Sequence, residues 1–233
     1  MKVLITTSQH VASFQLAALL KGSEIIFGDH FTDYPTDASN SIAHQILKFC
    51  LDHQIEKVFP LAFAEVAELR KSIILFDEFG IEVMLSADSR RFFTEASKIV
   101  NSFANLSAGL ISLGYPTKKI AIANVEGRGE LILIDDAVKD NLQIWNRVKA
   151  INFNQLGKWF NQSNFQPVAL YQPGDGFQAF YMLVENGELK CFNPVAEDTR
   201  KILAHVIQTN NMKGFYHVAI ANRTVLRIVN ASF

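Results

Sequence analysis

The 233-residue sequence has little of several features that would place it in a special class. Its two cysteines, Cys50 and Cys191, lie far apart and outside any Cys-X-X-Cys pair, which predicts reduced thiols in a reducing compartment. No apolar run approaches the roughly 20 residues that cross a bilayer. Residues 1–10 also turn polar too early for a signal peptide. We therefore expect a cytoplasmic protein without a membrane partner.

Neither positive nor negative charge is in excess. Lysine and arginine number 22 against 23 aspartate and glutamate, with a net charge of −1. A nucleic-acid-binding protein would favour a basic face, so we expect no nucleic-acid partner. The six histidines show no metal-ligand spacing, and no Gly-X-Ser-X-Gly elbow predicts a covalent nucleophile. What is abundant is apolar: 49% of residues are hydrophobic, enough for a sizeable core.

The first third of the chain alternates short apolar segments with segments of helical periodicity. The pattern predicts strands over residues 2–6, 24–27, 57–60 and 81–85, and helices over 11–21, 42–53 and 64–79. Gly22 and Gly80 follow the first and third of these helices, where a glycine commonly caps a helix end. Strands that alternate with helices of this length predict parallel βαβ units in a doubly wound sheet.

The pattern changes after residue 88. We expect a long helix over residues 89–112, with Asp88 or Ser89 as its N-cap, and a helix from about 137 to 149 capped by Asp135 and Asp136. A further helix is expected at 154–160 and another at 201–210. Strands are expected over residues 120–124, 130–134, 168–171, 178–184, 188–192, 214–221 and 225–230. Asn186-Gly187 is a strong hairpin signal. A parallel α/β half is thus followed by a mixed α+β half.

The order of several local motifs resembles the ATP-grasp superfamily, in particular carbamoyl-phosphate-synthase-like ligases. The last strand closes on Asn230-Ala231-Ser232-Phe233, which resembles the metal-binding strand of that family. Further motifs that match in order and spacing are residues 57–60, 95–98, 113–117 and 170–174. The resemblance implies an α/β fold with a pre-ATP-grasp parallel-sheet domain over residues 1–88 and an ATP-grasp-like body over 89–233. Within the body it implies a lid at about 115–167 and a C-terminal lobe at about 168–233.

The family's metal ligands are mostly missing from the matching positions. ATP-grasp ligases bind Mg²⁺ and ATP through an acidic or Gln residue on the penultimate strand and through a Glu and an Asn on the last strand. The corresponding positions here are Ala219, Ile228 and Asn230. Magnesium prefers several oxygen ligands, so a single Asn is not expected to hold it against water.

The nucleotide-binding positions also depart from the family. Lys98 matches a family lysine, and Gly127-Arg128-Gly129 matches part of the glycine loop, but Ala123-Asn124 replaces the usual Lys-Pro. The family resemblance nevertheless implies cofactor-binding roles for five residues. These are Lys98, Gly127, Arg128, Gly129 and Asn230. For each there is a plain structural alternative: an exposed lysine, a solvated turn beside Glu126 and Glu130, and an Asn that ends a strand.

Three functional hypotheses follow from this resemblance. The first is a degenerate member, inactive as a ligase by itself, that serves as a binding or regulatory module for a small molecule or a protein partner. The second is a divergent ATP-dependent carboxylate–amine ligase that uses ATP and Mg²⁺ and takes its missing ligands from Asp175, Glu197 or Asp198. The third is a homodimer whose cleft has become an interface. Fold alone does not choose among them.

Overall fold

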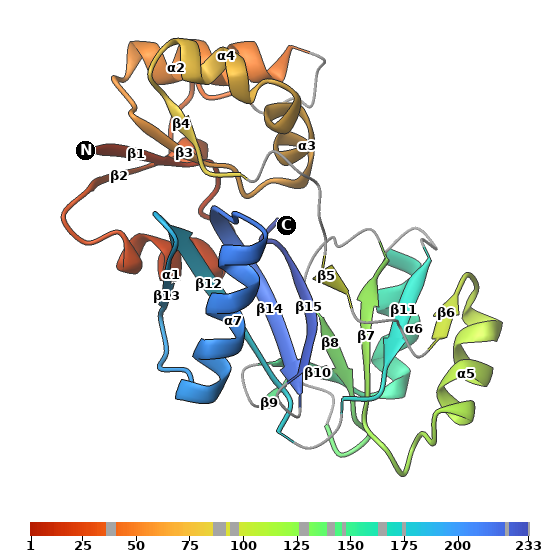
Figure 1. Ribbon diagram of the computed structural model, residues 1–233. Helices are drawn as coiled ribbons and strands as arrows, with labels where there is room; N and C mark the ends of the chain where they lie inside the picture. Colours follow the sequence, from red (N-terminus) through yellow and green to blue (C-terminus); the bar gives the residue numbers. More distant parts are fainter. Residues whose placement is uncertain are drawn as a thin grey trace. The chain divides into compact units, whose positions relative to one another are not determined.

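The computed structural model describes residues 1–35, 41–85, 92–93, 98–125, 131–138, 143–145, 148–162, 167–173, 176–221 and 224–232. The chain forms two compact units, both interrupted in sequence (Figure 1). Unit 1 contains residues 1–90, 181–216 and 230–233, and unit 2 contains residues 91–180 and 217–229. The predicted domain boundary between residues 88 and 89 falls within 86–91, outside the described ranges, and stays a prediction.

Unit 1 is built on the predicted parallel sheet. Its strands are β1 (Lys2–Ile5), β2 (Glu24–Phe27), β3 (Lys57–Phe59) and β4 (Glu82–Val83), in the order β2-β1-β3-β4. Every neighbouring pair is parallel; Leu4, for example, lies opposite Ile26 on one side and Val58 on the other. The helices between these strands provide the long crossovers that parallel pairing requires. The expected α/β class with an N-terminal parallel sheet is confirmed.

Alternate residues of β1 face two different cores, as the period of two along a strand requires. Leu4 packs with residues of α2 (Ile42–Asp52), α3 (Phe63–Lys71) and α4 (Ile73–Glu78). Val3 and Ile5 pack instead with residues of α1 (Val11–Leu19) and with Tyr181, Leu183 and Phe215. Both faces of the sheet are therefore covered, which explains why its strands are continuously apolar.

The predicted helices of unit 1 are confirmed, except that one of them is divided into two. The helix expected over residues 64–79 is two helices, α3 and α4, separated at Ser72. Gly22 and Gly80 adopt φ values of +84° and +71°, the left-handed conformation that ends helices. The two cysteines are not in a disulfide; Cys50 is buried on α2 and Cys191 is half-buried.

Unit 2 contains a six-stranded mixed sheet in the order β6-β11-β7-β8-β10-β9. The strands are β6 (Lys98–Val100), β7 (Ile120–Asn124), β8 (Ile132–Ile134), β9 (Gln143–Trp145), β10 (Val148–Ile151) and β11 (Val168–Tyr171). Its residues alternate between two cores. One, which we call the helix face, joins the sheet to α5 (Phe103–Ser112) and α6 (Phe153–Gln162). The other, which we call the alanine face, contains small residues from the same strands.

A second sheet has the order β13-β12-β14-β15-β5. Its strands are β5 (Phe92–Phe93), β12 (Gln178–Glu185), β13 (Glu188–Cys191), β14 (Gly214–Ala221) and β15 (Thr224–Asn230), and α7 (Glu197–Thr209) lies between β13 and β14 in the chain. The predicted hairpin at Asn186-Gly187 is confirmed, with positive φ at both residues. The turn expected at residues 222–223 lies outside the described residues. No helix in the described ranges is long and apolar enough to span a membrane.

Two of the predicted helices are wrong. Within the stretch 89–112, residues 98–100 form strand β6, and the helix begins only after Ser102, whose side chain accepts the N–H of Asn105. The helix expected at 137–149 is replaced by the antiparallel strands β9 and β10. Both errors have the same cause: β6 pairs with β11 and β10 with β8, and pairing between distant segments overrides local propensity. The proposed caps Asp88 and Ser89 lie outside the described residues.

Candidate functional site

Two positions that match metal ligands in the ATP-grasp family are buried and apolar. Ala219 on β14 is 0% exposed, and Ile228 on β15 is 1% exposed. Ala219 belongs to the alanine face, together with Ala123 at the position of the family's lid lysine. The described residues therefore do not fit Mg²⁺-ATP at these positions, since neither side chain has an oxygen to offer.

The alanine face is rich in alanine side chains, which come from strands of both the six-stranded and the five-stranded sheet; it also contains Tyr171, Phe177 and two leucines. Residues of β7, β10 and β11 meet residues of β12 and β14 in one buried cluster. Its alanines are Ala121, Ala123, Ala150, Ala169, Ala179, Ala219 and Ala221. Small side chains allow two backbones to approach closely, and protein interiors are packed with few voids. These residues form a buried apolar cluster in unit 2.

Asn230 ends β15 and is half-buried. Its Oδ1 atom is buried and has no hydrogen-bond partner among the described residues. The next residue is held by its backbone, because Ala231 N donates to Phe215 O at 2.8 Å. An unpaired buried amide oxygen carries a desolvation cost of about 1–3 kcal/mol.

Lys98 lies on a strand and not on the expected helix. It opposes Leu170 across the β6–β11 pair, and its Nζ donates to Ser112 Oγ at 3.2 Å. Ser112 in turn donates to Gly109 O near the end of α5. A cation at a helix C-terminus is favourable because of the helix dipole. This contact matches the plain alternative of an exposed lysine, and a phosphate-binding role for Lys98 stays a prediction.

The remaining candidates divide into two groups. Gly127, Arg128, Gly129 and Asp175 lie outside the described residues, so their roles stay predictions. Glu197 and Asp198 occupy the first turn of α7, where carboxylates stabilise the positive end of the helix dipole. Within the described part of the chain, no group of three or more His, Cys, Asp or Glu side chains could hold a metal ion.

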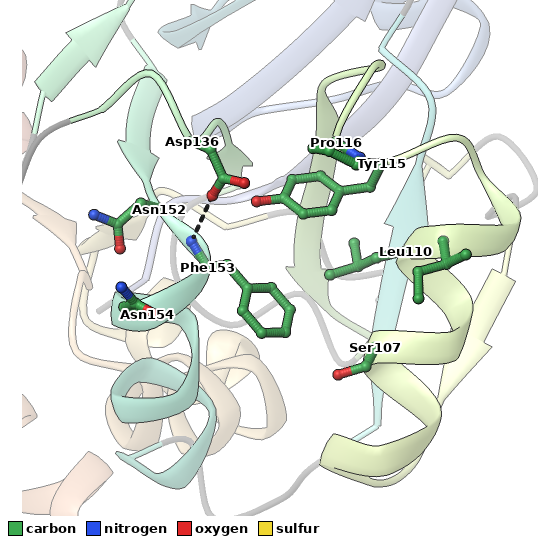
Figure 2. A pocket seen from close by; sticks show the side chains of 9 residues that line it. Ser107, Leu110, Tyr115, Pro116, Asp136, Asn152, Phe153 and Asn154 are labelled. Carbon is green, nitrogen blue, oxygen red and sulfur yellow. Dashed lines mark hydrogen bonds between the residues drawn. The ribbon is translucent and has the colours of Figure 1, made fainter.

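A cavity of about 550 Å³ lies on the helix face of unit 2 (Figure 2). It is bounded by α5, by the Tyr115-Pro116 turn, by Asp136 after β8, and by the start of α6. The residues that line it are Ser107, Leu110, Ile111, Tyr115, Pro116, Asp136, Asn152, Phe153 and Asn154. Its walls are mainly apolar with a few convergent polar groups, as is typical of small-molecule sites.

The start of α6 is fixed by a reciprocal cap. Asn152 Oδ1 accepts the N–H of Gln155 at 3.0 Å, and Gln155 Oε1 accepts the N–H of Asn152 at 3.2 Å. This is a capping box with Asn and Gln as its members. Asn152 Nδ2 also donates to Val138 O at 3.1 Å, and Asp136 Oδ1 accepts the N–H of Phe153 at 3.2 Å. The loop that carries Asp136 is thereby tied to the helix.

The carboxylates beside the cavity shape its electrostatics. The Tyr115 hydroxyl is buried, points toward Asp136 in Figure 2, and has no hydrogen-bond partner by distance and angle among the described residues. Burial first, then hydrogen bonding with Asp136, and then the negative charges of Asp136 and Asp135, raise the pKa of Tyr115. Burial acts to raise the pKa of Asp135 as well, but Lys119 at 2.7 Å and the Ala137 N–H outweigh it and lower that pKa.

The sequence pointed to parts of this cavity without predicting it. The predicted end of a helix at residue 112 and the helix near residues 154–160 are confirmed. Asp135 and Asp136, however, were assigned as caps of a helix that is not formed. In the structure Asp135 caps a turn through Ala137 N, and Asp136 caps α6 through Phe153 N. No local signal could have shown that α5 and α6, about 40 residues apart, share one cavity.

No family model and no curated protein matches the sequence. Solved ATP-grasp enzymes do match it in structure over its whole length, in agreement with the resemblance found in the sequence. A biotin carboxylase domain of 2-oxoglutarate carboxylase from Hydrogenobacter thermophilus matches with 10% identity and a TM-score of 0.44, covering 100% of this chain and 64% of that one. Biotin carboxylase from Campylobacter jejuni matches with 8% identity and a TM-score of 0.48, covering 98% and 65%.

A third match is L-amino acid ligase from Bacillus licheniformis, with 12% identity and a TM-score of 0.38, covering 99% of this chain and 66% of that one. The chain thus spans less than two thirds of the length of these three structures. At these identities and TM-scores the matches concern the fold, and no statement about the site rests on them.

Proposed function

We propose that this chain is an ATP-grasp-like protein that does not carry out Mg²⁺-ATP-dependent ligation by itself and serves as a binding or regulatory module. One observation carries the proposal: Ala219 and Ile228, at positions where the family binds metal, are 0% and 1% exposed. Hard cations bind through carboxylate and amide oxygens. An apolar side chain at each of two positions leaves Asn230 as the single family ligand.

The packing of the alanine face supports the same proposal. Ala123 stands where the family's lid lysine would reach a phosphate, and it is 0% exposed within that face. A phosphate there would have to displace buried methyl groups, without a cation at that position to balance its charge. Loss of catalysis with retention of the fold leaves binding as the activity for which the scaffold remains suited.

The alternative, a divergent carboxylate–amine ligase, has one observation in its favour. Asn230 Oδ1 is buried without a hydrogen-bond partner in the described ranges, as expected for an atom that accepts a hydrogen bond or coordinates a metal only when a ligand is bound. That hypothesis requires Mg²⁺-ATP to bind the folded chain and Asn230 to contribute to binding.

Thermal unfolding distinguishes the two hypotheses. The midpoint would be measured with no addition, with millimolar Mg²⁺-ATP, with ADP and with magnesium alone. A ligand at 100 times its dissociation constant stabilises the folded state by about 2.7 kcal/mol, so binding in the micromolar range would raise the midpoint by several degrees. We expect no shift with Mg²⁺-ATP beyond that with magnesium alone.

The Asn230→Ala variant provides the matched control. A shift with Mg²⁺-ATP that disappears in Asn230→Ala would overturn the proposal, and acceptor carboxylates would then be tested for ATP-dependent ligation. A second protein, an ATP-grasp enzyme that binds nucleotide, is measured in the same buffer to confirm that the assay detects such binding.

A further inference from the structure

The cavity on the helix face has a single charged wall. Among the described residues that line it, Asp136 alone carries a charge, and its Oδ1 already accepts the N–H of Phe153. Lys119, a described cation close to the cavity, forms an ion pair with Asp135 at 2.7 Å. Within the described part of the chain Asp136 forms no ion pair, which leaves its charge to a group inside the cavity.

The rest of the cavity is suited to an apolar or aromatic body. Leu110 and Pro116 contribute aliphatic surface, and the rings of Tyr115 and Phe153 lie with their centroids 6.1 Å apart at 32°. Figure 2 shows both rings between α5 and the start of α6, with the Tyr115 hydroxyl directed toward Asp136. A volume of about 550 Å³ lies in the range of roughly 300–1,000 Å³ that holds small molecules.

We propose that this cavity binds a small organic amine whose ammonium group pairs with Asp136 and whose apolar or aromatic body lies against Leu110, Tyr115 and Phe153. An ammonium group has three donors and no acceptor, so it matches a carboxylate and a phenol oxygen at one end of a pocket. Aromatic rings add to this attraction because their faces are electron-rich.

The same geometry disfavours an anion. The positive end of the α6 dipole, which would otherwise attract one, is already occupied by the Asp136 carboxylate through Phe153 N. Asp135 adds a second negative charge next to the first, although Lys119 offsets it. This site is separate from the alanine face, and the proposal does not depend on whether the chain binds nucleotide.

The test compares three probes with one body and different head groups: 2-phenylethylamine, 2-phenylethanol and 3-phenylpropionate. Each is titrated into the ¹⁵N-labelled full chain and followed by two-dimensional NMR. We expect the amine to bind at least tenfold more tightly than the alcohol, with shifts that cluster in α5, at Tyr115 and at the start of α6. The carboxylate is expected to bind more weakly than the alcohol.

Two variants and a control test whether Asp136 and Tyr115 bind the ammonium group. Asp136→Asn keeps an oxygen that can accept the Phe153 N–H, so the fold is retained; it should weaken amine binding about tenfold and leave alcohol binding unchanged. Tyr115→Phe removes only the hydroxyl and should weaken amine binding by less. Asp77→Asn, an exposed substitution on α4 of unit 1, should change neither.

Equal affinity for the three probes would overturn the proposal. So would amine binding that is unchanged in Asp136→Asn, or probe-induced shifts confined to residues outside the cavity. If Asp136→Asn failed to fold, the comparison of amine and alcohol in Tyr115→Phe would decide in its place.

Discussion

The two faces of the six-stranded sheet in unit 2 differ in what they can bind. The alanine face is a buried apolar cluster that includes Ala219 and Ala123, which the resemblance in sequence matches to polar positions of the ATP-grasp family. The helix face carries larger aliphatic residues and, at one end, a cavity with a carboxylate and a phenol. One sheet with strictly alternating residues thus has a side suited to packing and a side suited to binding. The loss of the metal site that we propose would leave the cavity on the helix face unaffected.

Placing a carboxylate on the alanine face tests this difference most strongly. Ala219→Glu would place a carboxylate in a buried apolar cluster, and we expect it to lower the free energy of unfolding by about 3–5 kcal/mol. Urea unfolding followed by circular dichroism measures the change. Ala108→Glu places the same side chain on an exposed position of α5 and should change stability by less than about 0.5 kcal/mol. If Ala219→Glu were as stable as Ala108→Glu, the alanine face would have room for polar groups.

Truncating the core of the helix face should have the next largest effect. Leu106 is 0% exposed on α5, and Leu106→Ala should cost about 3 kcal/mol through lost burial and an unfilled cavity. Ile111→Ala on the same helix is the control, since Ile111 is 69% exposed and its loss should have little effect. Equal urea midpoints for the two variants would show that α5 does not pack against the sheet as described.

Removing the cap of α6 should have a smaller effect that reaches the cavity. Asn152→Ala abolishes the capping box and the bond to Val138 O, and we expect a loss of about 1–2 kcal/mol in the free energy of unfolding. Because that bond ties the loop carrying Asp136 to α6, amine binding should weaken as well. Asn154→Ala, at an exposed position two residues later, should leave stability unchanged. Similar losses in both variants would contradict the capping role.

The smallest expected effect is a dependence of stability on pH beside the cavity. The pKa of Asp135 is lowered from 3.8 in the folded chain, so its pair with Lys119 stabilises the fold above that value. This contribution, about 0.2–1 kcal/mol for a partly exposed pair, is lost as pH falls below 3.8 toward the folded-state pKa. Urea unfolding of wild type and Asp135→Asn should therefore differ at neutral pH and converge in acid. A difference that persisted in acid would rule out the ion pair as its source.

Local signals predicted most of the parallel-sheet part of unit 1 and the hairpin at Asn186-Gly187. The periodicity of residues 2–27, the glycines at 22 and 80, and the Asn186-Gly187 turn each act within a few residues, and the structure confirms them. The failures at residues 98–100 and 143–151 arose where strands exist only because a distant strand pairs with them. The departures from the family at Ala219 and Ile228 could be read from the sequence. The cavity could not, because its walls come from four segments that only the fold brings together.

The buried thiol of Cys50 can report how fast the region around α2 in unit 1 opens. Burial raises its pKa to about 12, so the reactive thiolate is almost absent while α2 is packed. Alkylation of Cys50 must therefore wait until that helix opens, whereas Cys191, half-buried on β13, does not share this restraint. The labelling rate of Cys50 at saturating reagent equals the rate at which this part of the chain opens, a quantity that no equilibrium melt reports. Cys50 is thus a native reporter of local opening in the parallel-sheet part of unit 1.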